Sequence, residues 1–479
     1  MVTHSAIDVQ LQNALREWQR FDGRLYVQLT AALRAAIEAG ELPAGRRLPP
    51  ERLLAAYLSV GRRTVARAYE ALSDHALVDR RQGAGTRVTG PLVRPEDNRA
   101  AKRTTSLQRN IVFASLSQPT ADVIDLLAVY TPGGPGVIAD AVRAAAETIA
   151  QLSSEHHGYT PTGYEPLREA VAARFRASGI PTTADQILIT SGAQQAATLV
   201  ASDFVHPGET AIVEDPTLPG VIDVFRTLGA RLLTVPAGDA VALEATVRRN
   251  AVGGAYLTPT FHNPTGGVMP VEARRRVAAL SAELQLGLIE DLTVADLWLE
   301  REPPPPIAFY APDAPVFTIG SLSKVFWAGV RVGWVRGPAG TIAHLGRLKA
   351  VTDLGTSLVA QAVALELLDQ LDATAARRRD EMRGKLDRME ALLAGFEGWT
   401  WRRPPGGLCL WVRLPHGSAL AFTQVARAHG VGIAPGTITS ASDRFDDHIR
   451  LPFGDDPERT EEGMHRLAAA WHAFSHRRE

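Results

Sequence analysis

The stretch IGSLSK, residues 319–324, runs from an apolar segment into a turn of small residues that ends on a single lysine, Lys324. Arg331 follows seven residues later, within GVRVGW. A lysine that forms a Schiff base must be held rigidly, and its surroundings must lower the pKa of its ammonium group. The hydroxyls of Ser321 and Ser323 and the guanidinium of Arg331 suit a nearby phosphate ester. Taken alone, the stretch also matches an ordinary surface turn, so the segments around it decide its interpretation.

Two upstream segments carry groups that bind a phosphate and an aromatic hydroxyl. ITSGAQQ, residues 189–195, passes from a strand into a helix through a glycine turn, and its free N–H groups form a phosphate site where the helix begins. PTFHNPTG, residues 259–266, places Asn263 on a loop after a strand, where its amide could bond a ring hydroxyl. An ordinary Asn-Pro turn is the alternative for Asn263.

Two further segments place charged side chains on strands. Asp291 ends the strand-like run LIED, and Arg450 lies in HIRLPF, where it could pair bidentately with a carboxylate. Pyridoxal catalysis needs a carboxylate at the pyridinium nitrogen, because protonation of that nitrogen makes the ring an electron sink. An ordinary strand-end turn is the alternative for Asp291. All these fragments in this order favour a pyridoxal 5'-phosphate site.

Beyond about Val123, short β-rich runs alternate with longer helical stretches. Strands are expected at 186–190, 210–214, 255–259, 287–291 and 316–320. This rhythm predicts an α/β domain with a mostly parallel sheet covered by helices on both faces. The last hundred residues differ, with a helix over 375–393, strands at 408–414 and 448–451, and a final helix from about Pro457. They indicate a smaller α+β subdomain over about 375–475.

The first 89 residues have the pattern of a helix-turn-helix. Apolar residues at intervals of four predict a helix over 25–40, and 51–57 and 62–73 predict two more helices joined by a four-residue turn. The third helix opens with RRT, residues 62–64, and Arg67 follows one turn later. Arginine can address guanine in pairs of hydrogen bonds, and threonine can reach bases or phosphate. Residues 77–88 then predict a hairpin wing. A solvated basic helix is the alternative.

Composition and charge limit the function classes. The chain has 479 residues, and this length predicts two or three domains. Residues 1–90 carry 13 arginines, no lysine and nine acidic residues, although the whole chain has a net charge of −1, so the basic block fits a polyanion. Cys409 is the only cysteine, which excludes an internal disulfide and a cysteine-rich metal site and indicates a reducing compartment. No signal peptide or 18-residue apolar run is visible, so we expect a cytoplasmic protein without a membrane segment.

The head resembles the GntR-type winged helix over nearly its whole length, from LYVQL at residue 25 to the wing RRQGAGTRV. The resemblance implies that the head, residues 1–89, binds double-stranded operator DNA. Residues 90–122, polar and without sustained periodicity, are then the linker. By the same resemblance Arg52 contacts phosphate, Arg62 and Thr64 read or hold the site, and Gln82 and Gly83 lie in the wing. The residue pattern of the third helix adds Arg63 and Arg67 to the predicted DNA-binding residues. Gly61 stands where a serine or threonine usually caps the recognition helix, and glycine is a tolerable cap.

Residues 123–475 resemble the fold-type I aminotransferases. That resemblance implies that Lys324 forms the internal aldimine, Asp291 pairs with the pyridine nitrogen, Asn263 bonds the ring oxygen and Arg450 receives an amino acid's carboxylate. The residues it assigns to the phosphate are Ala193, Gln194, Ser321, Ser323 and Arg331. Tyr159, in GYTPTGYEPLREAV, matches a tyrosine that reaches the phosphate of the partner subunit, so a homodimer is implied.

A GntR-like head ahead of an aminotransferase-like body is the architecture of the MocR family of regulators. The resemblance implies a DNA-binding regulator whose large domain senses pyridoxal 5'-phosphate or its adduct with an amine. Two positions depart from the family pattern. Leu218 replaces an aromatic residue that stacks on the ring, and Thr293 replaces a tyrosine that bonds the ring oxygen. These losses argue against efficient turnover. A working aminotransferase with a vestigial head, or a regulator that has lost its cofactor, remains the alternative.

Overall fold

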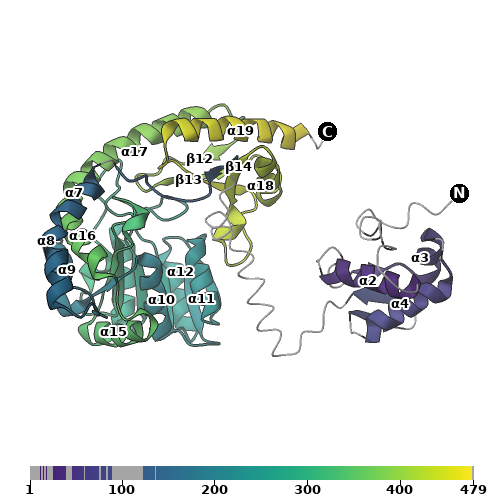
Figure 1. Cartoon of the computed structure of the whole chain (residues 1–479), viewed down its shortest axis with the longest axis horizontal. Helices are drawn as coiled ribbons and strands as arrows, with labels where there is room; N and C mark the ends of the chain where they lie inside the picture. Colours follow the sequence, from purple (N-terminus) through teal and green to yellow (C-terminus); the bar gives the residue numbers. More distant parts are fainter. Residues whose placement is uncertain are drawn as a thin grey trace. The chain divides into compact units, whose positions relative to one another are not determined.

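The structure, a computed structural model, divides the chain into two compact units, Met1–Leu107 and Gln108–Glu479 (Figure 1). The residues that the structure describes are 25–38, 46–58, 60–74, 77–81, 85–88, 122–134 and 136–476, together with Leu11, Leu15, Trp18 and Leu42. Most of the predicted linker therefore lies outside the described residues.

The small unit is a winged helix, as the sequence predicted. Its helices are α2 (Leu25–Glu38), α3 (Glu51–Tyr57) and α4 (Arg62–Asp74), and its strands are β1 (Arg47–Leu48), β2 (Val78–Arg81) and β3 (Gly85–Val88). The three strands form an antiparallel sheet in the order β1-β3-β2, and β1 was not expected. The apolar positions of α2 and α4 that are spaced by three or four residues are buried against one another, since they share one face of each helix.

The large unit contains a seven-stranded sheet. Its strands are β5 (Ile187–Thr190), β6 (Thr210–Asp215), β7 (Arg231–Pro236), β8 (Gly254–Leu257), β9 (Gly287–Asp291), β10 (Val316–Ser321) and β11 (Gly333–Arg336). They lie in the order β5-β11-β10-β9-β8-β6-β7. Only β11 runs antiparallel to its neighbours, so the expectation of a mostly parallel sheet is confirmed. Strands β7 and β11 were not expected.

Helices cover both faces of this sheet. One face packs against α10 (Ala193–Phe204), α11 (Pro219–Thr227) and α15 (Ala339–Asp353), and the other against α12 (Ala240–Arg249), α13 (Val271–Leu284) and α14 (Ile307–Tyr310). Successive strand residues alternate between the faces. On β8, Tyr256 therefore joins the α10 side, whereas Ala255 and Leu257 join the α12 side. Buried on both faces, the strands are nearly continuous apolar runs.

A group of helices lies to one side of the seven-stranded sheet (Figure 1). They are α7 (Val137–Ala144), α8 (Ala146–Glu155), α9 (Glu165–Ala177) and α16 (Leu358–Asp369), of which α9 contacts β5. The long α17 (Leu371–Leu393) follows α16 and runs over the top of the large unit in this view. Helix α16 contacts α7, α8 and α9. Within the described residues, no helix is both long and apolar enough to cross a membrane.

A five-stranded sheet forms the smaller layer of the large unit. Its strands, in spatial order, are β12 (Thr400–Trp401), β13 (Cys409–Arg413), β15 (His448–Pro452), β14 (Val431–Pro435) and β4 (Ile124–Leu126), packed with α18 (Ala419–Ala428) and α19 (Pro457–Ser475). Strand β4 pairs with β14 in parallel although it precedes the large sheet in the chain. The small layer is thus not confined to about 375–475, because it recruits a strand from the start of the large unit.

Candidate cofactor site and DNA-binding helix

The predicted cofactor residues follow the carboxyl ends of neighbouring strands. Asp291 is the last residue of β9, Lys324 lies three residues after β10, and Asn263 lies on the loop after β8. The turn after β5 leads into α10. Because β5, β8, β9 and β10 are parallel, these ends lie at one edge of the sheet, which is where open α/β sheets bind ligands.

The Lys324 amine lies inside the protein and is held by the backbone. Its Nζ donates a hydrogen bond to the carbonyl oxygen of Val129 at 2.5 Å, and Thr131 Oγ1 donates to the Lys324 carbonyl at 2.6 Å. Burial, helped by the positive charge of Arg450 and opposed by Asp291, lowers the pKa of Lys324 to about 8. An amine with this pKa is partly neutral near physiological pH and is available as a nucleophile.

Asp291 is buried and accepts two hydrogen bonds. The Tyr256 hydroxyl donates to Oδ2, and the Thr293 N–H donates to Oδ1 at 2.8 Å. Burial and the neighbouring carboxylate raise the pKa of Tyr256 well above its usual range, so its phenol remains a donor. Tyr256 was not predicted from the sequence, because its position on an apolar strand resembles that of any core aromatic.

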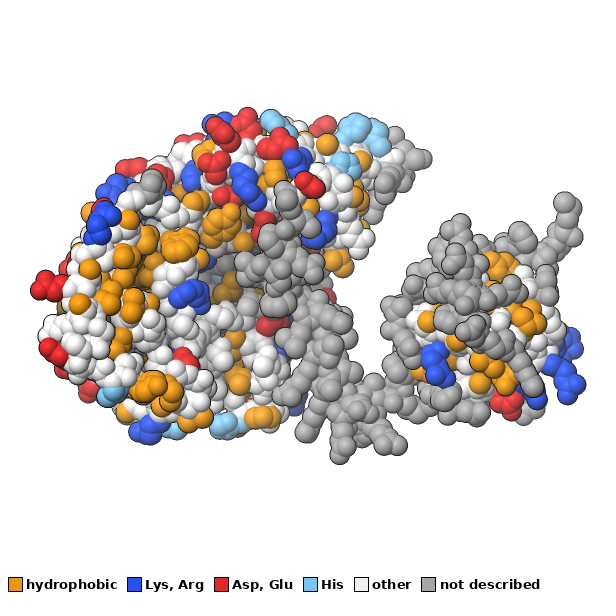
Figure 2. Space-filling view, in the orientation of Figure 1, with side chains coloured by type: hydrophobic (Ala, Val, Ile, Leu, Met, Phe, Trp, Pro, Cys, Tyr) orange, Lys and Arg blue, Asp and Glu red, His pale blue; other side chains and the backbone are white. Residues whose placement is uncertain are grey.

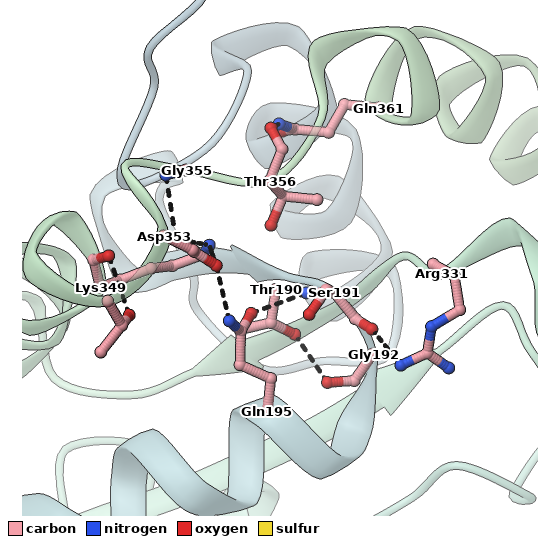
Figure 3. Close-up of polar contacts among 11 residues, drawn as sticks. Thr190, Ser191, Gly192, Gln195, Arg331, Lys349, Asp353, Gly355, Thr356 and Gln361 are labelled. Atoms are coloured by element: carbon pink, nitrogen blue, oxygen red, sulfur yellow. Dashed lines mark hydrogen bonds and ion pairs between the residues drawn. The ribbon is translucent and has the colours of Figure 1, made fainter. Parts of the chain in front are cut away.

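The turn that the sequence predicts to bind phosphate leads from β5 into α10. Gly192 precedes α10 with φ of 115°, a conformation that favours glycine, and a Cβ there would lie 3.1 Å from Arg331 Nη2. Arg331 Nη2 donates to the Ser191 carbonyl at 2.6 Å (Figure 3). Ala193 begins α10, and Gln194 Nε2 donates to the Gly220 carbonyl at 2.9 Å. The predicted turn and Arg331 are therefore brought together.

The two predicted serines form a second part of this region. Ser321 Oγ donates to Ser323 Oγ at 2.9 Å, and the Ser323 N–H donates to Ser321 Oγ at 3.2 Å. Ser321 is the last residue of β10 and Ser323 lies in the turn that leads to Lys324, so the strand end brings the two hydroxyls together.

Arg450 comes from the smaller sheet and is 3% exposed. Its Nη1 donates to Asn263 Oδ1 at 3.2 Å and its Nη2 to the Leu127 carbonyl at 2.7 Å, whereas its buried Nε has no hydrogen-bond partner in the structure. An unsatisfied buried guanidinium nitrogen fits an anionic ligand. The bond from Arg450 fixes Asn263 Oδ1 as an acceptor and leaves the Asn263 NH2 group available to donate to a ring oxygen. Cys409 Sγ lies 4.0 Å from the same Oδ1, and burial raises the pKa of this thiol.

Arg378, on α17, clamps the two segments that meet at Lys324. Its guanidinium donates to the carbonyls of Pro132 at 2.6 Å, Val325 at 3.0 Å and Phe326 at 3.3 Å. Arg378 also lines a pocket of about 300 Å³ that does not include Lys324. Neither this residue nor the carbonyls that it binds were predicted from the sequence, because backbone acceptors leave no signal in side-chain patterns.

Tyr159 lies apart from this group. Its side chain is 60% exposed, and its ring stacks on His157 with a centroid distance of 6.0 Å. Leu218 immediately precedes α11 and packs against the core on the side of the large sheet that α10, α11 and α15 cover. Within the described part of the chain, no three His, Cys, Asp or Glu side chains group as metal ligands.

The predicted recognition helix is α4, which begins at Arg62. Arg52, Arg63 and Arg67 are exposed and Thr64 is half-buried. Arg62 Nε is 3.1 Å from Glu51 Oε2, an ion pair that was not predicted from the sequence. The Arg67 guanidinium lies 5.5 Å from the centre of the Tyr26 ring. Gln82 and Gly83 lie outside the described residues.

These features define a class: a winged helix joined to an α/β domain of the fold-type I aminotransferase kind. Residues 121–467 match the family described as aminotransferase class I and II, and residues 25–88 match bacterial regulatory proteins of the gntR family. The chain is 30% identical to the uncharacterized HTH-type transcriptional regulator YisV of Bacillus subtilis, over 92% of this chain and 94% of that protein. It is 32% identical to 2-aminoadipate transaminase of Thermus thermophilus, over 69% of this chain and 85% of that protein.

A solved structure extends the comparison. The crystal structure of the alpha-aminoadipate aminotransferase LysN from Thermus thermophilus, complexed with N-(5'-phosphopyridoxyl)-L-leucine, matches with a TM-score of 0.69 and 30% identity. The match covers 77% of this chain and 96% of that one. The chain belongs to the MocR-like regulators, in which a GntR domain precedes an aminotransferase class I and II domain.

Proposed function

We propose that this GntR-type regulator binds pyridoxal 5'-phosphate through a Schiff base on Lys324 and senses the cofactor, or an amine or amino acid that reacts with it. The observation that carries the proposal is the buried Lys324 amine, with a pKa of about 8, at the strand ends that also hold Asp291 and the phosphate-binding turn. Ligand binding would change the population of the state that binds double-stranded operator DNA. The bound group supplies an electron-withdrawing ring and an aldehyde.

The residues of the chain have separate tasks in this proposal. Asp291, oriented by Tyr256, would hold the protonated ring nitrogen, and Asn263 would donate to the ring oxygen. The residues that would bind the phosphate are Ala193, Gln194, Ser321, Ser323 and Arg331. Arg450, with its unpartnered buried Nε, would receive the carboxylate of an amino-acid effector. The ligand in the LysN complex, a phosphopyridoxyl amino acid, combines these same chemical groups.

Two residues support a sensor over a fast enzyme. Leu218 can cover the ring face without the stacking of an aromatic side chain, and Thr293 is too short to replace a phenol. Both losses affect how the protein tunes the electrons of the cofactor ring. They should therefore lower the rate of turnover more than the affinity for the cofactor. A working aminotransferase is the competing function, and it is favoured by the similarity to 2-aminoadipate transaminase.

We further propose that the large unit forms a homodimer. Exposed apolar side chains occur on the loop before α9, at the end of α15 and at the start of α16: Tyr159 at 60%, Val351 at 88%, Leu354 at 53% and Val359 at 54%. Hydrophobic side chains also gather over the side where α7, α8 and α16 lie (Figure 2). Exposed apolar surface of this kind is typical of protein interfaces. Tyr159 on this surface could reach the phosphate of the partner subunit.

The cofactor proposal is tested by absorbance. Protein incubated with pyridoxal 5'-phosphate should gain a visible band that Lys324→Ala removes, because the covalent link is lost. Lys385→Ala is the matched control, since Lys385 Nζ also donates to a backbone carbonyl, that of Gly454 at 2.9 Å. A wild-type protein that stays colourless with added cofactor would overturn the proposal.

The DNA-binding proposal is tested with the DNA upstream of the protein's own gene. Wild-type protein should bind it in a salt-sensitive manner, and Arg62→Ala should abolish binding while leaving the absorbance band unchanged. Arg143→Ala, which removes an exposed arginine from the large unit, is the control. No salt-sensitive binding, together with rapid turnover of amino donors, would instead identify an enzyme.

A further inference from the structure

A side chain outside the predicted site, that of Gln195, holds the turn at residues 191–193 together with Arg331. The peptide groups on either side of Ser191 are each held by a side chain, since Gln195 Oε1 accepts the Ser191 N–H at 2.8 Å and Arg331 Nη2 donates to the Ser191 carbonyl at 2.6 Å (Figure 3). Gly192 and Ala193, whose N–H groups would meet a phosphate, follow directly. The direction of these N–H groups therefore depends on the Gln195 side chain as well as on Arg331.

Asp353, the last residue of α15, lies behind Gln195. Gln195 Nε2 donates to Asp353 Oδ2 at 2.6 Å, and Lys349 Nζ donates to both carboxylate oxygens at 2.7 Å (Figure 3). The Lys349 side chain is fully buried, at 0% exposed, and that of Asp353 is 29% exposed. A hydrogen-bonded chain thus runs from Lys349 through Asp353 and Gln195 to Ser191.

The carboxylate determines which way the Gln195 amide faces. An ionised carboxylate accepts hydrogen bonds and cannot donate, so the NH2 group of Gln195 must face Asp353 and its oxygen must face Ser191. Burial raises the pKa of Asp353, but hydrogen bonds from Lys349, Gln195 and the Gly355 N–H outweigh this effect, and the pKa lies below its usual value. The group is therefore ionised at neutral pH.

The same carboxylate also fixes the loop that follows α15. Asp353 Oδ1 accepts the Gly355 N–H at 2.9 Å. Gly355 has φ of +133°, and a Cβ there would lie 2.7 Å from the Thr160 carbonyl oxygen, so the two backbones are in close contact. Thr160 adjoins Tyr159, the residue proposed to reach the phosphate of the partner subunit. Asp353 therefore supports both parts of the chain that are assigned to phosphate.

We propose that Asp353 is a positioning residue for the cofactor phosphate, acting through Gln195 on the turn at residues 191–193. The inference rests on the proposed function, since it needs pyridoxal 5'-phosphate to bind at Lys324. The proposal also predicts a result that a purely structural role of Asp353 would not produce. Loss of the network should weaken binding of pyridoxal 5'-phosphate much more than binding of pyridoxal, which has the same aldehyde and ring but no phosphate.

The experiment compares the affinities of full-length variants for both compounds, measured by the visible absorbance band. Asp353→Asn and Gln195→Met should each weaken binding of pyridoxal 5'-phosphate by about tenfold, the effect of one misplaced charge-assisted hydrogen bond, and binding of pyridoxal by less than about twofold. Inorganic phosphate should compete less well with pyridoxal 5'-phosphate in both variants. Asp372→Asn, which removes an equal charge from an ion pair with Arg174 at 2.8 Å, should change neither affinity.

Two results would overturn the inference: equal losses for both compounds, or no loss for pyridoxal 5'-phosphate. Asp353→Asn leaves the buried Lys349 without a full counter-charge and could prevent folding. Gln195→Met keeps that ion pair and removes the link through which Asp353 is proposed to act on Ser191, so the loss specific to pyridoxal 5'-phosphate must appear in this variant too, and its absence there overturns the inference. Wild-type protein that binds neither compound would refute the proposed function itself, a result distinct from either of these.

Discussion

Lys324 lies among charges of both signs, and the balance sets its reactivity. Because burial and Arg450 lower its pKa to about 8, the neutral amine becomes the main species only above that pH. The rate of covalent binding of pyridoxal 5'-phosphate should therefore rise with pH through about 8 and then level off. Stopped-flow absorbance across this range measures the rate. A rate that keeps rising to about pH 10, the value of an unperturbed lysine, would contradict this explanation.

Tyr256 is one of the residues whose contacts only the structure revealed. Tyr256→Phe removes the hydroxyl that donates to Asp291 and leaves a buried carboxylate oxygen with one donor fewer. We expect a loss of about 1–3 kcal/mol in the free energy of unfolding and a shifted absorbance maximum of the bound cofactor. Thermal unfolding and absorbance spectra measure these effects. Tyr310→Phe is the control, since the Tyr310 ring packs under Arg275. An unshifted spectrum in Tyr256→Phe would mean that Tyr256 does not influence the ring nitrogen through Asp291.

At the scale of elements, helices α3 and α4 are joined by the Arg62–Glu51 ion pair. Glu51→Gln removes a negative charge beside the proposed DNA surface and releases Arg62, so operator affinity should rise. Because exposed ion pairs are worth about 0.2–1 kcal/mol, the gain should be about 1.4- to fivefold. Fluorescence anisotropy with labelled operator DNA measures it, and Glu272→Gln, paired with Arg275 at 3.0 Å in the large unit, is the control. Weaker binding by Glu51→Gln would mean that the pair orders α4 for DNA.

Elements with a local signal were predicted closely, and others were not. Helix α3 and strand β9 have the expected bounds, since both are bounded by clear changes of residue type. Strands β7 and β11 were missed. Strand β11 is only four residues long and follows directly on the Arg331 turn, so its pairing with β5 and β10 has no independent pattern. Strand β4 has three residues and pairs with a strand about 300 positions away.

At the scale of the molecule, the apolar surface around α15 and α16 should hold two copies together. Val351→Arg places a charge where the side chain is 88% exposed, so it should leave the fold intact and convert dimer to monomer. Sedimentation velocity over a concentration series measures the dissociation constant, which should rise at least about tenfold. Val241→Arg, at an exposed site on α12, is the control. A wild-type protein that is monomeric throughout the series would exclude this interface.

The class of the chain and the order of its functional motifs followed from the sequence alone. IGSLSK, the strand-end Asp291 and the RRT of the recognition helix depend on neighbours a few positions away, and strand and helix periods assign them to elements. The tertiary structure alone decided which distant groups meet. The Val129 carbonyl reaches Lys324 across 195 residues, Asp353 reaches Gln195 across 158 and Tyr256 reaches Asp291 across 35. Such contacts depend on the order of the strands in the sheet and on the packing of the helices, and no local sequence pattern encodes that arrangement.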